Sequence, residues 1–184
     1  MVMKILIIDI ETTGFIPEGH SIVEIGIVLC DSDTRITTPV FNQVIRDDEW
    51  DYNKHRNAWI FKNTDLTPEQ VSKAKHINHY KEELQNLFNK YLITAYNKRF
   101  DVSFMTARGF KLWDTKDLQE NAKDIAQTYT GSRRPPSVEK LHRWFFPERN
   151  YIETHRGLDD AMHEAEIFYK FCDMKAGKDV KIVL

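Results

Sequence analysis

Uninterrupted runs of apolar residues mark the strands in the first part of the chain. The run at 4–10 is rich in isoleucine and predicts a strand that is buried on both faces. A second run covers 20–30, and the short connection between the two contains Pro17 and Gly19, so we expect a hairpin. A third strand is expected at 40–46. The chain therefore begins with three antiparallel strands.

Helical spacing takes over further along. Thr67 and Pro68 have the pattern of a capped helix start, with a proline in the first turn. Apolar residues at helical spacing predict an amphipathic helix over 77–91. Further helices are expected from about Phe100, from Ser137 to about Phe145, and after the segment 155–161.

Two further strands are expected among these helices. The apolar run at 92–96 is a short buried strand, and its place between helices favours parallel pairing. We place a fifth strand at 121–126 rather than at 111–115, because the first choice leaves room for a complete helix before it. The pattern predicts an α/β fold with a mixed, five-stranded sheet and flanking helices.

Two carboxylates stand where the first strand ends. Asp9 and Glu11 are two residues apart, so their side chains point to the same side of a strand. Like charges at that distance disfavour each other's ionisation unless a cation or a proton lies between them. A divalent metal ion would satisfy both. The alternative is that the two acids only open a turn completed by Thr12, Thr13 and Gly14.

Composition places few limits on function. The chain has 184 residues, 41% of them hydrophobic, which is sufficient for one domain over 1–184 with a full core. Cys30 and Cys172 have no metal or redox spacing, so we expect reduced thiols in a cytoplasmic protein. No segment has the length of a membrane span. A net charge of −2 argues against nucleic-acid binding by bulk electrostatics, but not against binding through metal ions.

Other polar residues each have a structural interpretation beside a functional one. Asp101 is either a site acid or the N-cap of the helix near Phe100. Successive helical residues are splayed by about 100°, so only one of Asp159 and Asp160 can face a common site. Glu24, inside the second strand, is expected to hold a buried hydrogen-bond network. His155 lies on a segment without helical periodicity.

Aromatic residues are concentrated in the polar stretch from 47 to 63. Such side chains beside basic residues can stack on nucleic-acid bases, and they can equally anchor a long loop to the core. The residues are Trp50, Tyr52, Trp59 and Phe61.

Three ordered motifs together resemble the DEDDh family of 3′ to 5′ exonucleases. They are Asp9-Ile10-Glu11-Thr12-Thr13-Gly14, then Asn97 with Phe100 and Asp101, then His155 with Asp160 five residues later. The family includes the proofreading subunit of bacterial DNA polymerase III, ribonuclease T and oligoribonuclease. The similarity extends over nearly the whole chain, and the order of the motifs makes it specific.

The resemblance implies a fold and a set of roles. The fold is RNase H-like, with strands four and five parallel to the first. The metal ligands would be Asp9, Glu11, Asp101 and Asp160, which hold two Mg²⁺ or Mn²⁺ ions, with Asp9 between them. His155 would be the general base, so the catalytic residues are His155, Asp9 and Glu11.

The resemblance also implies a substrate. This is the 3′ end of single-stranded nucleic acid, with DNA favoured over RNA and nucleoside 5′-monophosphates released; a DNA polymerase is a candidate partner. Substrate contacts are expected from Thr12, Thr13, Asn97, Phe100 and Phe61.

The chain departs from the family pattern at several positions. Gly157 replaces a usual alanine and is expected to loosen the loop before the last helix. Tyr96 and Lys98 replace a frequent histidine and alanine. Ile60-Phe61-Lys62 stands where a histidine-glycine pair touches the terminal nucleotide in some members, so recognition of that nucleotide is less well defined than catalysis.

Two other classes of protein remain open. A haloacid-dehalogenase-like phosphatase also has acids after a buried strand and a later Asp-Asp pair. That class needs aspartate at position 11 and gives no role to His155. A non-catalytic nucleic-acid-binding or polymerase-accessory domain would leave four acids and a histidine without a role.

Overall fold

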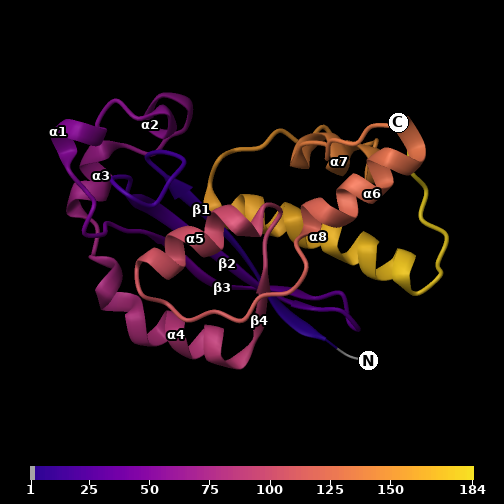
Figure 1. The fold of residues 1–184 in the computed structure, drawn as a ribbon, viewed down its shortest axis with the longest axis horizontal. Helices are drawn as coiled ribbons and strands as arrows, with labels where there is room; N and C mark the ends of the chain where they lie inside the picture. The colour runs from indigo at the N-terminus through magenta and orange to yellow at the C-terminus, as the bar shows by residue number, and fades with distance from the viewer. Residues whose placement is uncertain (1–2) are drawn as a thin grey trace.

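A four-stranded mixed sheet forms the centre of the protein in the computed structural model, which describes residues 3–184 (Figure 1). The strand order is β3-β2-β1-β4. β1 (Lys4–Thr12), β2 (Ile22–Asp31) and β3 (Thr37–Val44) are antiparallel neighbours, and β4 (Leu92–Thr94) pairs with β1 in parallel. The predicted α/β class, the antiparallel start and the parallel fourth strand are confirmed.

Helices follow the strands and cover the sheet. Thr67 caps its helix with a complete capping box, and Ser137 caps another by accepting a hydrogen bond from Lys140 N, both as predicted. The helices are α1 (Tyr52–His55), α2 (Trp59–Asn63), α3 (Pro68–Lys73), α4 (Lys81–Lys90), α5 (Lys98–Ala107), α6 (Leu118–Thr130), α7 (Val138–Phe145) and α8 (Gly157–Lys175).

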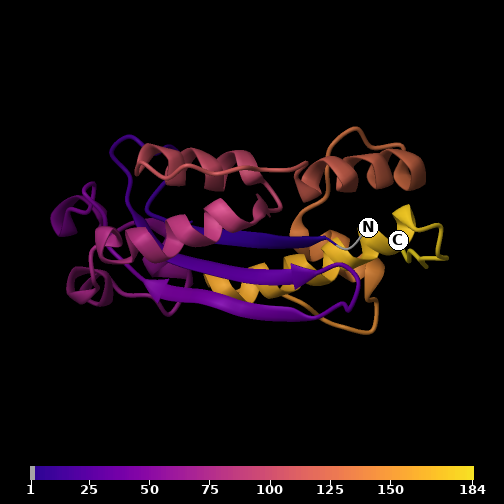
Figure 2. The same cartoon turned by 90° about the horizontal axis from the view of Figure 1, so that it is seen from below.

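Alternation along β1 separates two hydrophobic layers. Ile5 and Ile7 pack on one face with residues of α6, α7 and α8, while Leu6 and Ile8 pack on the other face with residues of α4 and α5. Figure 2 shows the sheet edge-on, with α8 (yellow) running along one face. The sheet is therefore buried on both sides, which explains the uninterrupted apolar run from Ile5 to Ile8 in β1 and the mostly apolar sequence of β2.

The fifth strand predicted at 121–126 is wrong. These residues lie inside α6, whose Asp117 N-cap, left-handed Gly131 and buried Leu118, Ala122 and Ile125 give a complete helical signature. The segment 111–115, the other position considered for the fifth strand, does approach the sheet. Ile93 N donates to Trp113 O and Thr115 N to Ile93 O, both at 2.9 Å. This contact amounts to a single bridge, so the described sheet has four strands.

Two smaller predictions need adjustment. The helix expected over 77–91 begins as a 3-10 turn, Ile77–Tyr80, before α4. The irregular stretch from 47 to 63 contains the short helices α1 and α2.

Among the described residues, no helix is both long and apolar enough to cross a membrane.

Candidate active site

Asp9 and Glu11 lie at the end of β1 on the face that α8 covers. They continue the alternation of Ile5 and Ile7, so both side chains point the same way, as predicted. Oδ2 of Asp9 is buried and has no hydrogen-bond partner among residues 3–184. A buried carboxylate oxygen without a donor is costly, and a bound cation would satisfy it.

Asp101 approaches the same strand from α5. It is the fourth residue of that helix rather than its N-cap, which is Asn97, so the capping alternative is excluded. Its Oδ1 accepts a hydrogen bond from Ile10 N at 3.2 Å, and only 4% of the residue is exposed. Burial raises the pKa of Asp101 to about 7. The contact fixes this carboxyl beside the backbone between Asp9 and Glu11.

Asp160 enters from the first turn of α8. Its Oδ1 accepts from the Tyr151 hydroxyl at 2.8 Å and from Thr154 N at 3.3 Å, and its Oδ2 accepts from Arg156 N at 3.0 Å. Asp160 is buried, whereas Asp159 is exposed, so only one acid of the pair faces the site, as predicted. Three donors thus hold the Asp160 carboxyl in one orientation.

Direct backbone contact sets the position of α8. A Cβ placed on Gly26 would lie 2.0 Å from the Gly157 carbonyl carbon, and one on Gly157 would lie 2.7 Å from Gly26 N and 2.9 Å from Asp9 O. The expectation that Gly157 loosens a loop is therefore wrong: it is the buried first residue of α8, and only glycine permits this approach.

Glu24 completes the attachment of α8 to the sheet. Its carboxylate accepts from Arg156 Nε and Nη2, at 2.7 to 3.2 Å, and from Gly157 N at 3.0 Å. The structural role expected for Glu24 is confirmed. The ion pair ties β2 to the residue that follows His155.

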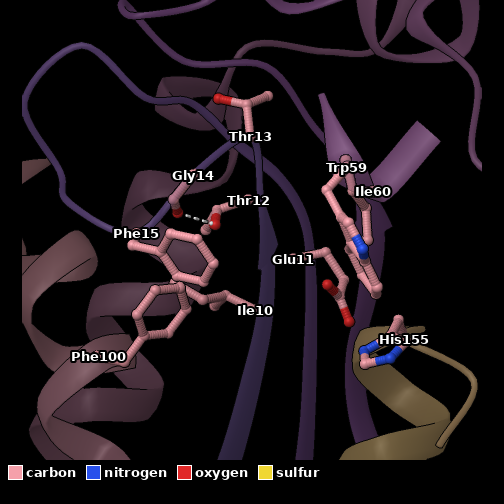
Figure 3. Close-up of a pocket in the computed structure, with 10 residues that line it drawn as sticks. All are labelled: Ile10, Glu11, Thr12, Thr13, Gly14, Phe15, Trp59, Ile60, Phe100 and His155. Atoms are coloured by element: carbon pink, nitrogen blue, oxygen red, sulfur yellow. Dashed lines mark hydrogen bonds between the residues drawn. The ribbon is translucent and has the colours of Figure 1, made fainter. Parts of the chain in front are cut away.

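His155 immediately precedes this anchored corner. Its φ of 54° lies in the left-handed region, which a non-glycine residue adopts only where its surroundings hold it there. Ligand atoms of His155, Glu11 and Asp160 all lie within 4.8 Å of one another. The imidazole also meets the Trp59 ring edge-on, with centroids 4.8 Å apart. Figure 3 shows Glu11 and His155 pointing toward each other below Trp59.

A cavity of about 350 Å³ opens in front of these side chains. Glu11, Thr12, Thr13, Phe100 and His155, all predicted site residues, line it. The other lining residues are Ile10, Gly14, Phe15, Trp59 and Ile60. Phe15 and Phe100 lie on one side of the cavity and Trp59 on the other (Figure 3).

Two predicted contact residues, Phe61 and Asn97, do not line this cavity, and Thr13 has a structural contact as well. Phe61 does not line the cavity; it packs against Val23 and its neighbours and meets Trp50 edge-on. Asn97 is exposed at the start of α5. Thr13 uses its hydroxyl to accept from Ser21 N at 2.9 Å, which gives this side chain a structural task. Phe15, 88% exposed, was not expected in the site.

The raised pKa values of the site carboxyl groups show that these groups lie close together. Burial is the main cause that raises the pKa of Asp9, and the charges of Glu11, Glu164, Asp101 and Asp160 add to it. Burial, followed by the charge of Asp160, raises the pKa of Glu11 to about 9. Without cations, Glu11 holds a proton near neutral pH. The buried oxygen donors and the unpartnered Asp9 Oδ2 fit hard divalent cations.

Sequence reasoning missed two further acids. Glu164 lies one helical turn after Asp160, is 3% exposed, and accepts from Tyr96 N at 2.9 Å. Burial and the charge of Asp101 raise its pKa. Glu153 is half-buried, and burial with the Asp160 charge raises its pKa to about 7. Glu164 was detectable, because four residues along a helix lead back to the same face.

Fold and site together define a class of protein: a nuclease with an α/β fold and a carboxylate and histidine centre of DEDDh type. The exonuclease model of the RNase T family matches residues 6–168, so the chain belongs to this exonuclease family. The resemblance inferred from the motifs is confirmed, and the two alternative classes are set aside. Members of the family use divalent metal ions.

Comparison with individual proteins agrees. The chain is 28% identical over 180 residues to a PolC-type DNA polymerase III of Thermotoga petrophila and 25% identical over 178 residues to that of Caldanaerobacter subterraneus. Each match covers 92% of this chain but only 12% of the polymerase.

Solved structures share the fold. The nuclease domain of 3′hExo, a DEDDh family member bound to rAMP, has a TM-score of 0.65 at 20% identity, covering 98% of this chain and 96% of that one. Exonuclease I of E. coli in complex with a dA16 oligonucleotide has a TM-score of 0.63 at 17% identity, covering 94% of this chain and 41% of that one.

Proposed function

We propose that residues 1–184 form a single exonuclease domain that removes nucleoside 5′-monophosphates from the 3′ end of single-stranded nucleic acid. The observation that carries this is the convergence of carboxyl groups from β1, α5 and α8, with His155 within 4.8 Å of Glu11 and Asp160. An aromatic cavity opens directly beside them. Acids for metal ions, a base for water and a surface for a nucleotide are thus adjacent.

The metal ligands would be Asp9, Glu11, Asp101 and Asp160. When two Mg²⁺ or Mn²⁺ ions are bound, they supply positive charge to the scissile phosphate and to the leaving 3′ oxygen. The chain contributes the geometry. Ile10 N orients Asp101, and Tyr151 and two backbone amides orient Asp160, so these ligands are fixed before any ion arrives.

His155 is the group that takes the proton of the attacking water. A neutral imidazole nitrogen accepts this proton, and the neighbouring carboxylates of Glu11 and Asp160 stabilise the imidazolium that results. The edge-on contact with Trp59 and the left-handed backbone restrict the ring. Positioning of the base is therefore built into the corner before α8.

The cavity is suited to one terminal nucleotide. Its volume of about 350 Å³ is at the lower end of ligand pockets. Phe15 and Trp59 are 88% and 55% exposed, so their rings are available for stacking on bases. Stacking on an aromatic ring tolerates every base, as an exonuclease requires. We place the last nucleotide between these rings, with its phosphate toward Glu11.

DNA is proposed as the preferred substrate. The curated relatives are DNA polymerases, and the E. coli neighbour binds a dA16 oligonucleotide, whereas another neighbour of similar fold recognises histone mRNA. The similarity to PolC-type polymerases also favours a second candidate role, the removal of misincorporated nucleotides for a polymerase partner.

The test uses 5′-labelled single strands of DNA and of RNA, with Mg²⁺, Mn²⁺ or EDTA. We expect a ladder that shortens from the 3′ end, nucleoside 5′-monophosphates as product, faster digestion of DNA, and no reaction in EDTA. A strand with a blocked 3′ end should resist. Cutting of circular DNA, or digestion in EDTA, would contradict the proposal.

A further inference from the structure

Two histidines and a glutamate meet between α7 and α8. His142 lies on α7, and His163 and Glu166 lie one turn apart on α8. One potential ligand atom from each lies within 4.8 Å of the other two. None of the three belongs to the proposed catalytic centre, which uses different residues of α8.

We propose that His142, His163 and Glu166 form a separate site for a borderline transition-metal cation, with Zn²⁺ as its best fit. Two imidazoles and one carboxylate are a ligand set that Zn²⁺ accepts, leaving a fourth tetrahedral position for water. Ligand atoms around a tetrahedral Zn²⁺ are about 3.4 Å apart. The separations in the cluster, which reach at most 4.8 Å, would shorten by up to about 1.4 Å, and the 2.7 Å contact between His142 Nε2 and Glu166 Oε2 would lengthen by about 0.7 Å.

His163 is already oriented as a ligand. Its Nδ1 lies 2.8 Å from the carbonyl oxygen of Asp159, one turn earlier on α8. A carbonyl can only accept, so Nδ1 carries the proton and Nε2 keeps its lone pair. Metal-bound histidines commonly use their second nitrogen in this way. The Tyr151 ring stacks on the imidazole at 3.9 Å and restricts its rotation.

His142 and Glu166 supply the other two ligands. His142 is fully buried, and its Nε2 lies 2.7 Å from Glu166 Oε2. Its Nδ1 has no partner among the described residues, so Glu166 alone determines where its proton lies. Arg149 Nη1 holds the other oxygen, Oε1, at 2.5 Å. A cation bound to Nε2 would leave the imidazole neutral with its proton on Nδ1, and it would break only the hydrogen bond between Nε2 and Oε2.

Solvent can reach this cluster. The side chains of His163 and Glu166 are 27% and 34% exposed, so an ion has an entry path and a bound water has room. The cluster also contacts the catalytic centre through one residue. Tyr151, stacked on His163, donates its hydroxyl to Asp160. A cation here would link α7 to α8 through His142, His163 and Glu166. By fixing the His163 ring, it would also restrict Tyr151 and, through the Tyr151 hydroxyl, the Asp160 carboxyl.

The experiment must exclude binding of Zn²⁺ to the proposed catalytic residues. We would therefore titrate Zn²⁺ by calorimetry into an Asp9→Asn/Glu11→Gln/His155→Ala protein, after circular dichroism has shown it folded. One equivalent of Zn²⁺ should bind. Adding His163→Ala or Glu166→Gln to this background should weaken binding by more than about 100-fold, since loss of an outer contact alone costs 10- to 100-fold. His79→Ala, which removes an exposed histidine elsewhere, should leave binding unchanged.

A spectroscopic measurement gives an independent answer. Co²⁺ in a tetrahedral site absorbs strongly in the visible range, so the background protein should become coloured with one equivalent of Co²⁺ and lose the colour when Zn²⁺ is added. His163 and Glu166 are partly exposed, so both variants should fold, and Glu166→Gln also retains the shape of the side chain. Absence of Zn²⁺ binding in the background protein, or equal binding by the His163→Ala variant, would overturn the proposal.

Discussion

The hydroxyl of Tyr151 donates a hydrogen bond to Oδ1 of Asp160 at 2.8 Å, across the corner that contains His155. Burial and the Asp160 charge raise the pKa of Tyr151, so the hydroxyl stays protonated and remains a donor. The contact joins the segment after α7 to the first turn of α8. The hydroxyl orients a proposed metal ligand and is not itself a ligand.

Tyr151→Phe isolates this contact, because the ring and its stacking remain. We expect a 10- to 100-fold loss of Mn²⁺ affinity, the usual effect of removing a partner of a metal ligand. The measurement is Mn²⁺ titration of exonuclease activity. Tyr129→Phe, on exposed α6 surface, is the matched control. Unchanged Mn²⁺ dependence would show that the hydroxyl is not needed to orient Asp160.

Asp9→Asn should abolish nearly all turnover while the protein stays folded. Its Oδ2 is buried without a donor, and burial together with the charges of four nearby acids raises the pKa of Asp9, so the neutral amide relieves repulsion in the metal-free protein. We therefore expect its thermal midpoint in EDTA to equal or exceed that of the wild type. Asp159→Asn, next to the site but exposed, should retain full activity. A folded, active Asp9→Asn protein would place the metal centre elsewhere.

His155→Ala tests the base. Loss of general-base catalysis should lower kcat by about 10² to 10⁴ at saturating metal and substrate. Mn²⁺ binding and single-strand binding should persist, since all four acids remain. His79→Ala serves as the control histidine. Should kcat stay at the wild-type value, His155 has no part in proton transfer.

Trp59 has two tasks in the proposed site, holding His155 and stacking on a base. Trp59→Ala should raise KM by about 5- to 150-fold, given about 1 to 3 kcal/mol for one stacked base. It should also lower kcat, because the imidazole loses its edge-on contact. Trp59→Phe should recover most of both. Trp113→Ala, at another exposed tryptophan, is the control; equal kinetics of Trp59→Ala and wild type would exclude both tasks.

The pH dependence of stability follows from the raised carboxyl pKa values. Between the ordinary pKa of 4.5 and about 9, the folded protein holds a proton on Glu11 that the unfolded chain has released. The free energy of unfolding of the metal-free protein therefore falls as pH rises through this window. We expect a higher thermal midpoint in EDTA near pH 5 than near pH 8.5. Glu11→Gln should reduce the difference, and Mn²⁺ should remove it by replacing the protons.

Local signals were sufficient to predict most of the elements. Alternation placed Asp9 and Glu11 on one face of β1. Helix geometry allowed only one of Asp159 and Asp160 to face the site, and the position five residues after His155 in the family motif indicated Asp160. The choice of 121–126 as a strand failed because it depended only on the room left for a preceding helix, whereas Leu118, Ala122 and Ile125 lie at helical spacing. Asp117 caps the start of α6 and Gly131 ends it, and these two residues indicate a helix when they are considered together.

Contacts between distant segments were beyond sequence reasoning. The backbone approach of Gly26 to Gly157 appears in the sequence only as two glycines far apart, and the local pattern around Gly157 indicates a loose loop. Trp59 was recognised as a possible stacking residue, but its pairing with His155 depends on how α2 folds over the end of the sheet. Phe61, chosen by its motif position, turned out to pack toward Val23 instead.

The order of the acids along the chain has a consequence for biosynthesis. β1 carries two of the proposed ligands and is made before the other described elements, whereas Asp160 and the histidine before it are made after all the other described strands and helices. A nascent chain whose α8 has not yet emerged from the ribosome lacks part of the proposed cation site and the proposed base. Hydrolytic competence should therefore appear only after α8 has been made and has packed against β1 and β2.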